Sequence, residues 1–169
     1  MTQIIKNRQA VADNYTLVTL AEGEAPASTA LPTGAIIVPL AVWQAQKSEL
    51  TTRGTPVGVW LDVTEGAEDV ADDLASLPVI AVNFPKFTDG RGYSTARLLR
   101  ERYGYTGEIR AIGDVLHDQL FLMARCGFDA FALREGKDIA KALNAFATFK
   151  TPYQAAADES RPLFRRRTA

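Results

Sequence analysis

The chain has 169 residues, of which 47% are hydrophobic and 23% are charged, and its formal net charge is -1. This composition excludes a disordered or fibrous protein, and the length fits one domain of about 100–200 residues, which we place over 1–169. The balanced charge excludes a global field that attracts nucleic acid or anionic lipid. The one cysteine, Cys126, excludes an internal disulfide. We expect no membrane association and a cytoplasmic location, because no apolar run reaches the about 18–20 residues of a membrane span and no signal-peptide core is present.

The first twenty residues predict a short β-hairpin. Apolar residues such as Ile4, Ile5 and Val11 alternate with polar ones, which is typical of two short antiparallel strands. Residues 21–32 are small, acidic and proline-containing, so we interpret them as a linker to the body of the protein.

Residues 33–150 predict an α/β core. Five apolar runs begin at residues 35, 57, 79, 108 and 129, and stretches with helical spacing follow them, such as Ala67, Val70, Ala71 and Leu74. Continuous apolar strands that alternate with amphipathic helices indicate about five parallel βα units, as an open sheet or a partial TIM-like barrel. The third unit is the longest. Its extra residues fall in a loop at the carboxyl end of a strand, where α/β proteins place their functional groups.

That loop is the first candidate site, for a small anion or an anionic substrate. Gly90 and Gly92 let backbone N–H groups turn inward, and Ser94 is predicted to cap the helix that follows, with Tyr93 packing on Leu98. The alternative is a well-capped loop whose cations point into water. The side chains that we assign to this site from the loop are Lys86, Asp89, Arg91, Tyr93 and Ser94.

The second candidate site follows the fourth strand. Asp114 and His117 lie three residues apart, so His117 could act as a general acid or base with Asp114 orienting it. Alternatively, Asp114 caps a helix and His117 lies in solvent. Arg110, inside a strand, needs a carboxylate or a bound anion as its partner, and Arg134 reaches the same edge of the sheet. We add both arginines to the anion site and predict no metal site.

Residues 151–169 form a tail that ends in Arg165-Arg166-Arg167-Thr168-Ala169. It is either a solvated terminus or a docking arm anchored by Leu163 and Phe164. We also expect a homodimer, because an open sheet has two edges to cover and helices on one side leave an apolar face bare.

Long motifs that recur in order carry a family resemblance. They are Ile4-Ile5-Lys6-Asn7, Gly34 to Leu40 with Trp43, Phe84-Pro85-Lys86-Phe87, Asp89 to Ser94, Gly113-Asp114-Val115, Asp118-Gln119 and Arg125 to Asp129. With these motifs the chain resembles a bacterial family catalogued as domain of unknown function 934. The family has Asp-Gly in the opening turn where this chain has Asn7-Arg8, and this departure disfavours a tight two-residue hairpin there.

Members of the family are encoded beside sulfite reductase and other sulfate-assimilation enzymes, and they are often labelled as oxidoreductases. The resemblance therefore implies an accessory protein of assimilatory sulfite reduction, which binds a small oxyanion or docks on the reductase. The alternatives are an autonomous α/β enzyme with an acid/base site at the strand ends, or a purely structural subunit. No flavin, nicotinamide, haem or iron–sulfur motif is present, so the cofactor is left open.

Overall fold

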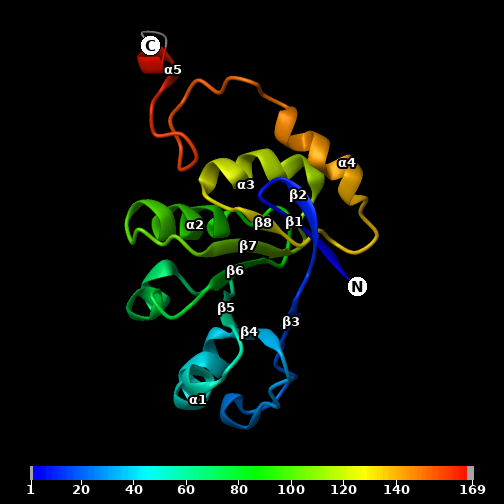
Figure 1. The fold of residues 1–169 in the computed structure, drawn as a ribbon, viewed down its shortest axis with the longest axis vertical. Coiled ribbons are helices and arrows are strands. Elements are labelled where there is room, and N and C mark those ends of the chain that lie inside the picture. Colours follow the sequence, from blue (N-terminus) through cyan, green and yellow to red (C-terminus); the bar gives the residue numbers. More distant parts are fainter. Residues whose placement is uncertain (1, 167–169) are drawn as a thin grey trace.

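A computed structural model describes residues 2–166, and its framework is one eight-stranded sheet with helices packed on it (Figure 1). The order of the strands is β2-β1-β8-β7-β6-β5-β4-β3. β4 to β8 run parallel, as the apolar runs predict, and they lie side by side in chain order, which the sequence did not predict. The strands are β1 (Gln3–Lys6), β2 (Gln9–Ala12), β3 (Tyr15–Leu17), β4 (Ala35–Pro39), β5 (Val57–Leu61), β6 (Val79–Phe84), β7 (Glu108–Gly113) and β8 (Ala130–Phe131).

The helices follow the strands along the chain and several are shorter than the spacing predicts. The pattern over 67–74 forms a 3₁₀ helix, and the pattern over 139–146 divides into α4 and η4. The α-helices are α1 (Leu40–Thr52), α2 (Arg91–Glu101), α3 (Leu120–Cys126), α4 (Ile139–Leu143) and α5 (Leu163–Arg166). The 3₁₀ helices are η1 (Pro26–Ser28), η2 (Ala67–Asp73), η3 (His117–Gln119) and η4 (Asn144–Ala147). Within residues 2–166, no helix has both the length and the apolarity to cross a membrane.

The turn between β1 and β2 is a tight two-residue turn, so the expectation drawn from Arg8 is wrong. Lys6 pairs with Gln9, and both Asn7 and Arg8 take positive φ angles, of 50° and 63°. Positive φ at both central residues is the geometry of a type I′ hairpin turn, which normally favours glycine at the second position. The guanidinium of Arg8 lies 5.8 Å from the centre of the Phe146 ring, a cation–π contact that helps to hold this conformation.

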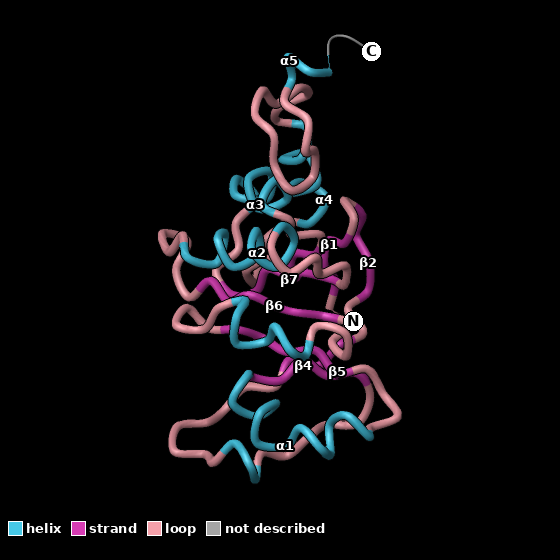
Figure 2. The backbone as a smooth tube through the Cα atoms, turned by 90° about the vertical axis from the view of Figure 1, so that its left-hand side faces the viewer, coloured by secondary structure: helices cyan, strands magenta, loops and turns pink. Residues whose placement is uncertain are grey.

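The sheet is curled into an open half-barrel because its two edge strands are almost consecutive in the chain. β2 forms one edge and ends at residue 12, whereas β3 forms the other edge, parallel to β4, and begins at residue 15. Seven strand spacings would separate the edges of a flat sheet by about 33 Å, but Asp13 and Asn14 can span at most about 11 Å. The sheet must therefore curve until its edges approach each other. Figure 1 shows β3 following β2 directly along the chain, and Figure 2 shows the strands that lie between these edges, from β1 to β4.

The curl buries the side of the sheet that carries no helices, which we call the inner face. α1 packs on β4 and β5, and α2 packs on β6, on the opposite, outer face, where most of the core lies. On the inner face, Ile37, Val79, Ala81 and Ile112 form a second buried cluster. The expected bare apolar face of the sheet is thus largely covered within one chain.

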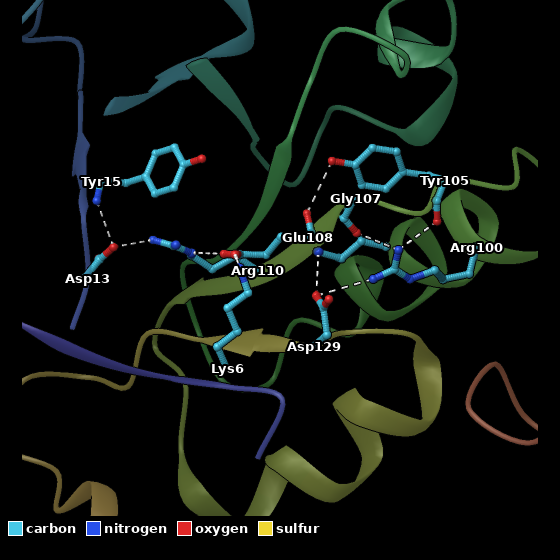
Figure 3. A network of polar contacts seen from close by, with 10 residues as sticks. Lys6, Asp13, Tyr15, Arg100, Tyr105, Gly107, Glu108, Arg110 and Asp129 are labelled. Carbon is cyan, nitrogen blue, oxygen red and sulfur yellow. Dashed lines mark hydrogen bonds and ion pairs between the residues drawn. The ribbon is translucent and has the colours of Figure 1, made fainter. Parts of the chain in front are cut away.

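A neutral network of charges occupies the inner face (Figure 3). The Arg110 guanidinium donates to Glu108 through Nε at 2.6 Å and to Asp13 through Nη1 at 2.9 Å. Lys6 Nζ lies 2.6 Å from the other Glu108 oxygen, which raises the pKa of Lys6. Both Glu108 and Arg110 side chains are only 4% exposed. Carboxylates from the chain itself therefore serve as the partners that the buried Arg110 requires.

The amino end of β7 is fixed by a second arginine. Arg100 donates to the carbonyl groups of Tyr105 and Gly107, and its guanidinium lies 3.4 Å from Asp129 (Figure 3). It also donates through Nε to the carbonyl group of Gly127. Asp129 accepts a 2.7 Å hydrogen bond from the backbone N–H of Ile109, and burial raises the pKa of its carboxyl group. These bonds hold β7 in register with β8.

We predict that Glu108→Gln destabilises the fold by about 3–5 kcal/mol, because it leaves the buried Arg110 charge without its closest carboxylate. The matched control is Lys6→Met, which removes the exposed cation from the same carboxylate and should cost at most about 1 kcal/mol. Urea unfolding followed by circular dichroism measures both values. Equal free energies of unfolding for Glu108→Gln and the wild type would show that the network does not stabilise the half-barrel.

Candidate functional site

Three loops meet at the carboxyl edge of the sheet, and Asp114 joins them. Its backbone N–H donates to Phe84 O at 2.7 Å, at the end of β6. One carboxylate oxygen accepts the backbone N–H of Phe87 at 3.2 Å, and the other accepts Nη1 of Arg134 at 3.0 Å, from the loop after β8. The predicted proximity of the Lys86 loop, Asp114 and Arg134 at one edge is therefore present in the structure.

A glycine makes this junction possible. Gly113, at the end of β7, has a φ of +91°, and a Cβ atom there would lie 2.5 Å from Phe84 O. Any side chain at this position would clash with the backbone of β6 and would strain a conformation that glycine adopts freely. Gly113 thus lets the chain turn so that Asp114 reaches the neighbouring loop.

We call residues 85–90 the Phe87 loop, because side chains hold the backbone of Phe87 on both sides. Besides the bond from Asp114, Gln119 Nε2 donates to Phe87 O at 3.0 Å, and Gln119 Oε1 accepts the N–H of Leu116 at 3.1 Å. The Phe87 side chain nevertheless remains 56% exposed, and its neighbour Lys86 is also exposed. The loop therefore presents an aromatic ring to solvent from a fixed backbone.

Asp89 and Arg91 form an ion pair with each other at the start of α2. The Asp89 carboxylate accepts Arg91 Nε at 3.0 Å and Nη2 at 2.6 Å, and also the backbone N–H of Arg91 at 3.2 Å. These bonds lower the pKa of Asp89 to about 2. A carboxylate of the chain thus occupies the first N–H group of α2, where an external anion was expected.

Ser94 does not cap this helix, so that prediction is wrong. α2 begins at Arg91 after Gly90, which places the exposed Ser94 inside its first turns. Tyr93 is half-buried and its ring meets that of Phe84 edge-on, with centroids 5.4 Å apart. Because the helix starts four residues earlier than predicted, the side chain of Asp89, and not that of Ser94, accepts a hydrogen bond from a backbone N–H of the first turn.

The expected pair of Asp114 and His117 is not assembled. Both carboxylate oxygens of Asp114 are engaged elsewhere, and His117 lies exposed at the start of η3. No hydrogen bond or ion pair joins the two side chains in the described part of the chain. Arg110 also lies apart from the Phe87 loop, since its partners are on the inner face.

Sequence reasoning missed three residues that shape these sites. Gln119 and Phe87 complete the Phe87 loop, and Asp13 fastens the N-terminal segment to Arg110. An apolar aromatic side chain in a polar loop was the available signal for Phe87, whereas nothing local marks Asp13 as a partner of a residue 97 positions away.

One other side chain, Cys126, bears on possible chemistry. Cys126 is half-buried at the end of α3, and burial raises the pKa of its thiol, which disfavours the nucleophilic thiolate. Residues 2–166 contain no group of three or more His, Cys, Asp or Glu side chains arranged to hold a metal ion.

The middle of the tail, residues 152–158, packs against α3, whereas α5 lies farther from it (Figure 1). Arg125 Nη1 donates to Asp158 at 2.7 Å, and the backbone N–H of Ala157 donates to Arg125 O at 3.0 Å. Arg166 Nη2 donates to Pro152 O at 2.6 Å. Arg165 and Arg166 of the arginine run belong to the described residues, whereas residues 167–169, on which the prediction of a docking arm also rests, lie outside them.

We predict that Asp114→Ala loosens the Phe87 loop. A hydrogen bond to a charged group contributes about 1.5–3 kcal/mol, so its loss should speed amide hydrogen exchange at Phe87 by about 10- to 100-fold. NMR-detected exchange measures this rate. Asp118→Ala, an exposed aspartate four residues later, is the control and should leave the rate unchanged. Unaltered protection of Phe87 in Asp114→Ala would contradict the role given to this carboxylate.

Comparison with known proteins gives a family but no activity. A search of the curated proteins finds no match to the chain. A family model described as "Bacterial protein of unknown function (DUF934)" matches residues 58–164, which include β5 to β8, the Phe87 loop, Asp114 and Gln119. Because the match covers more than half of its length, the chain belongs to this family of bacterial proteins, domain of unknown function 934.

Proposed function

We propose that the protein is a cytoplasmic accessory protein of assimilatory sulfite reduction, which docks on sulfite reductase through the Phe87 loop. The pathway and the partner rest on the resemblance to a family encoded beside that reductase. The mode of action rests on one observation, an exposed Phe87 ring on a backbone that Asp114 and Gln119 hold from both sides.

A fixed, exposed aromatic side chain suits recognition by another protein. Aromatic anchors contribute much of the binding energy at protein interfaces, because they bury a large apolar area. A loop that is already ordered loses little conformational entropy when a partner covers it. Lys86 places a positive charge beside the ring, which favours an acidic rim around the pocket that would receive it.

The charges at the edge support docking over the capture of an oxyanion or an acid/base reaction. Arg91 is paired with Asp89, and Arg134 is paired with Asp114, so carboxylates of the chain already balance both guanidinium groups. His117 has no carboxylate to orient it within residues 2–166. A protein surface that buries Phe87 requires none of these ion pairs to open.

We predict that Phe87→Ser abolishes docking while the protein stays folded. In a strain that lacks the chromosomal copy, this variant should fail to restore growth on sulfate and should lose co-purification with the reductase. Leu98→Ser is the matched control, since Leu98 is 38% exposed on α2, outside the loop, and it should behave as the wild type. Normal growth of the deletion strain on sulfate would refute the pathway, and full activity of Phe87→Ser would refute the docking surface.

We infer, as a second proposal, that two copies associate through α3 and the tail. The inner face is covered within one chain, whereas Leu122, Phe149, Tyr153 and Phe164 are each 55–66% exposed. The Phe149 ring packs on Phe121 with centroids 5.2 Å apart, which continues the patch along α3. Exposed apolar side chains of this size favour association with another protein surface, and a two-fold dimer is the commonest closed assembly.

Sedimentation at micromolar concentration tests this association. We expect a species of twice the 18.4 kDa chain mass for the wild type and a monomer for Leu122→Asp, which places a charge on the exposed side of α3. Leu17→Asp, an exposed leucine on β3, is the control and should remain dimeric. A wild-type monomer under these conditions would rule out the dimer.

A further inference from the structure

A cavity of about 210 Å³ lies on the inner face, between β3 and the carboxyl ends of β7 and β8. Its walls are apolar, from Leu17, Ile37, Ile112 and Ala132. Its charged lining consists of two arginines, Arg110 and Arg134, and two acids, Asp13 and Glu135. Its volume equals that of about seven liquid waters at about 30 Å³ each, enough for a molecule with a small ring. None of the lining residues belongs to the Phe87 loop, so this cavity is separate from the proposed docking surface.

Arg110 brings an unused hydrogen-bond donor to this cavity. Its side chain is 4% exposed, and it donates through Nε to Glu108 and through Nη1 to Asp13. Among residues 2–166, no partner accepts a hydrogen bond from Nη2. A guanidinium has five N–H donors in one plane, so the Nη2 group can still bind an acceptor from a ligand. The Tyr15 ring lies 5.2 Å from the guanidinium carbon and keeps this end of the cavity apolar.

One end of the cavity is buried and the other end is open to solvent. Arg110 is at its enclosed end, whereas the Arg134 side chain is 51% exposed and is tied to Asp114 at 3.0 Å. Arg134 therefore stands at the rim. A ligand that enters from the carboxyl edge would pass this ion pair, in which Asp114 balances the Arg134 charge, before it reaches the apolar walls.

We propose that this cavity binds a small carbon acid, an organic carboxylate whose apolar body lies against Ile37, Ile112 and Ala132 and whose carboxylate accepts from Arg110 Nη2. The walls favour a carbon body, because burial of apolar surface stabilises the complex by roughly 25 cal/mol per Å². An inorganic dianion gains less, because Glu108 and Asp13 already neutralise much of the Arg110 charge. The position, at the strand ends inside a barrel-like sheet, is one where α/β proteins bind small molecules.

Benzoate is a suitable probe, and isothermal titration calorimetry on the full chain measures its binding. We expect saturable binding at one site per chain, at least ten-fold tighter than benzyl alcohol, which has the same ring without the charge. Ala132→Leu fills the cavity without touching the ion network and should weaken benzoate at least ten-fold. Ala140→Leu, at an exposed position on α4, is the matched control and should bind as the wild type does.

A second variant guards against misfolding of Ala132→Leu. Leu17→Trp enlarges a 45% exposed side chain at the cavity and should obstruct it from the surface, with the same loss of benzoate binding. Absence of saturable benzoate binding to the wild type would overturn the proposal. Undiminished binding to a folded Ala132→Leu or Leu17→Trp would do so as well, as would displacement of benzoate by equimolar sulfate. None of these outcomes depends on growth on sulfate, so the cavity and the docking surface are tested separately.

Discussion

The Asp13–Arg110 ion pair holds together the two parts of the chain whose approach makes the sheet a half-barrel. Asp13 belongs to the two-residue connection between the edge strands β2 and β3, and Arg110 projects from the inner face of β7, near the middle of the strand order. The pair thus spans the interior of the curl. Without a partner on the connection, the buried guanidinium would rely on Glu108 alone, and the N-terminal segment would lose its anchor.

The structural role of each arginine discussed above depends on how deeply its side chain is buried. Arg110 and Arg100 are largely buried and satisfy carboxylates or carbonyl groups that would otherwise lack partners, so they determine the packing of β7. Arg91 and Arg134 lie at the carboxyl edge, where each is paired with one aspartate and shapes a loop. Isolated surface ion pairs add little to stability. The pairs at the edge therefore matter mainly because they fix the position of the backbone around Phe87.

The parallel core could be predicted from the sequence because its signals are local. β4 to β7 begin at the predicted residues 35, 57, 79 and 108, since each is a continuous apolar run followed by helical spacing, and β8 begins one residue late. β3 was not predicted as a third strand, because three residues give no pattern and their partner strand starts eighteen positions further on. The turn at Arg8 was misjudged, because a distant ring, Phe146, supports its strained conformation.

The sequence predicted where the candidate site lies, but it did not predict which residues pair with each other there. Parallel strands must end at one edge, which brings Lys86, Asp114 and Arg134 near one another whatever the loops do. Which acid pairs with which cation depends on where each helix starts and on loop geometry. Because α2 starts at Arg91 and not after Ser94, Asp89 forms its ion pair with Arg91. Asp114 instead binds Arg134 and the backbone N–H of Phe87. Sequence spacing does not encode that choice.

β7 connects the interior with the edge. Glu108 and Arg110 are two residues apart and share the inner face, Ile109 between them is held by Asp129, and Gly113 and Asp114 follow at the carboxyl end. A shift of one residue in the pairing of this strand would turn Arg110 toward the apolar outer core and would move Asp114 away from Phe87. The register of β7 therefore fixes the positions of the buried Glu108–Arg110 network, of the Arg110 donor at the cavity and of the Asp114 carboxylate that holds the Phe87 loop. A change in register would move all three together.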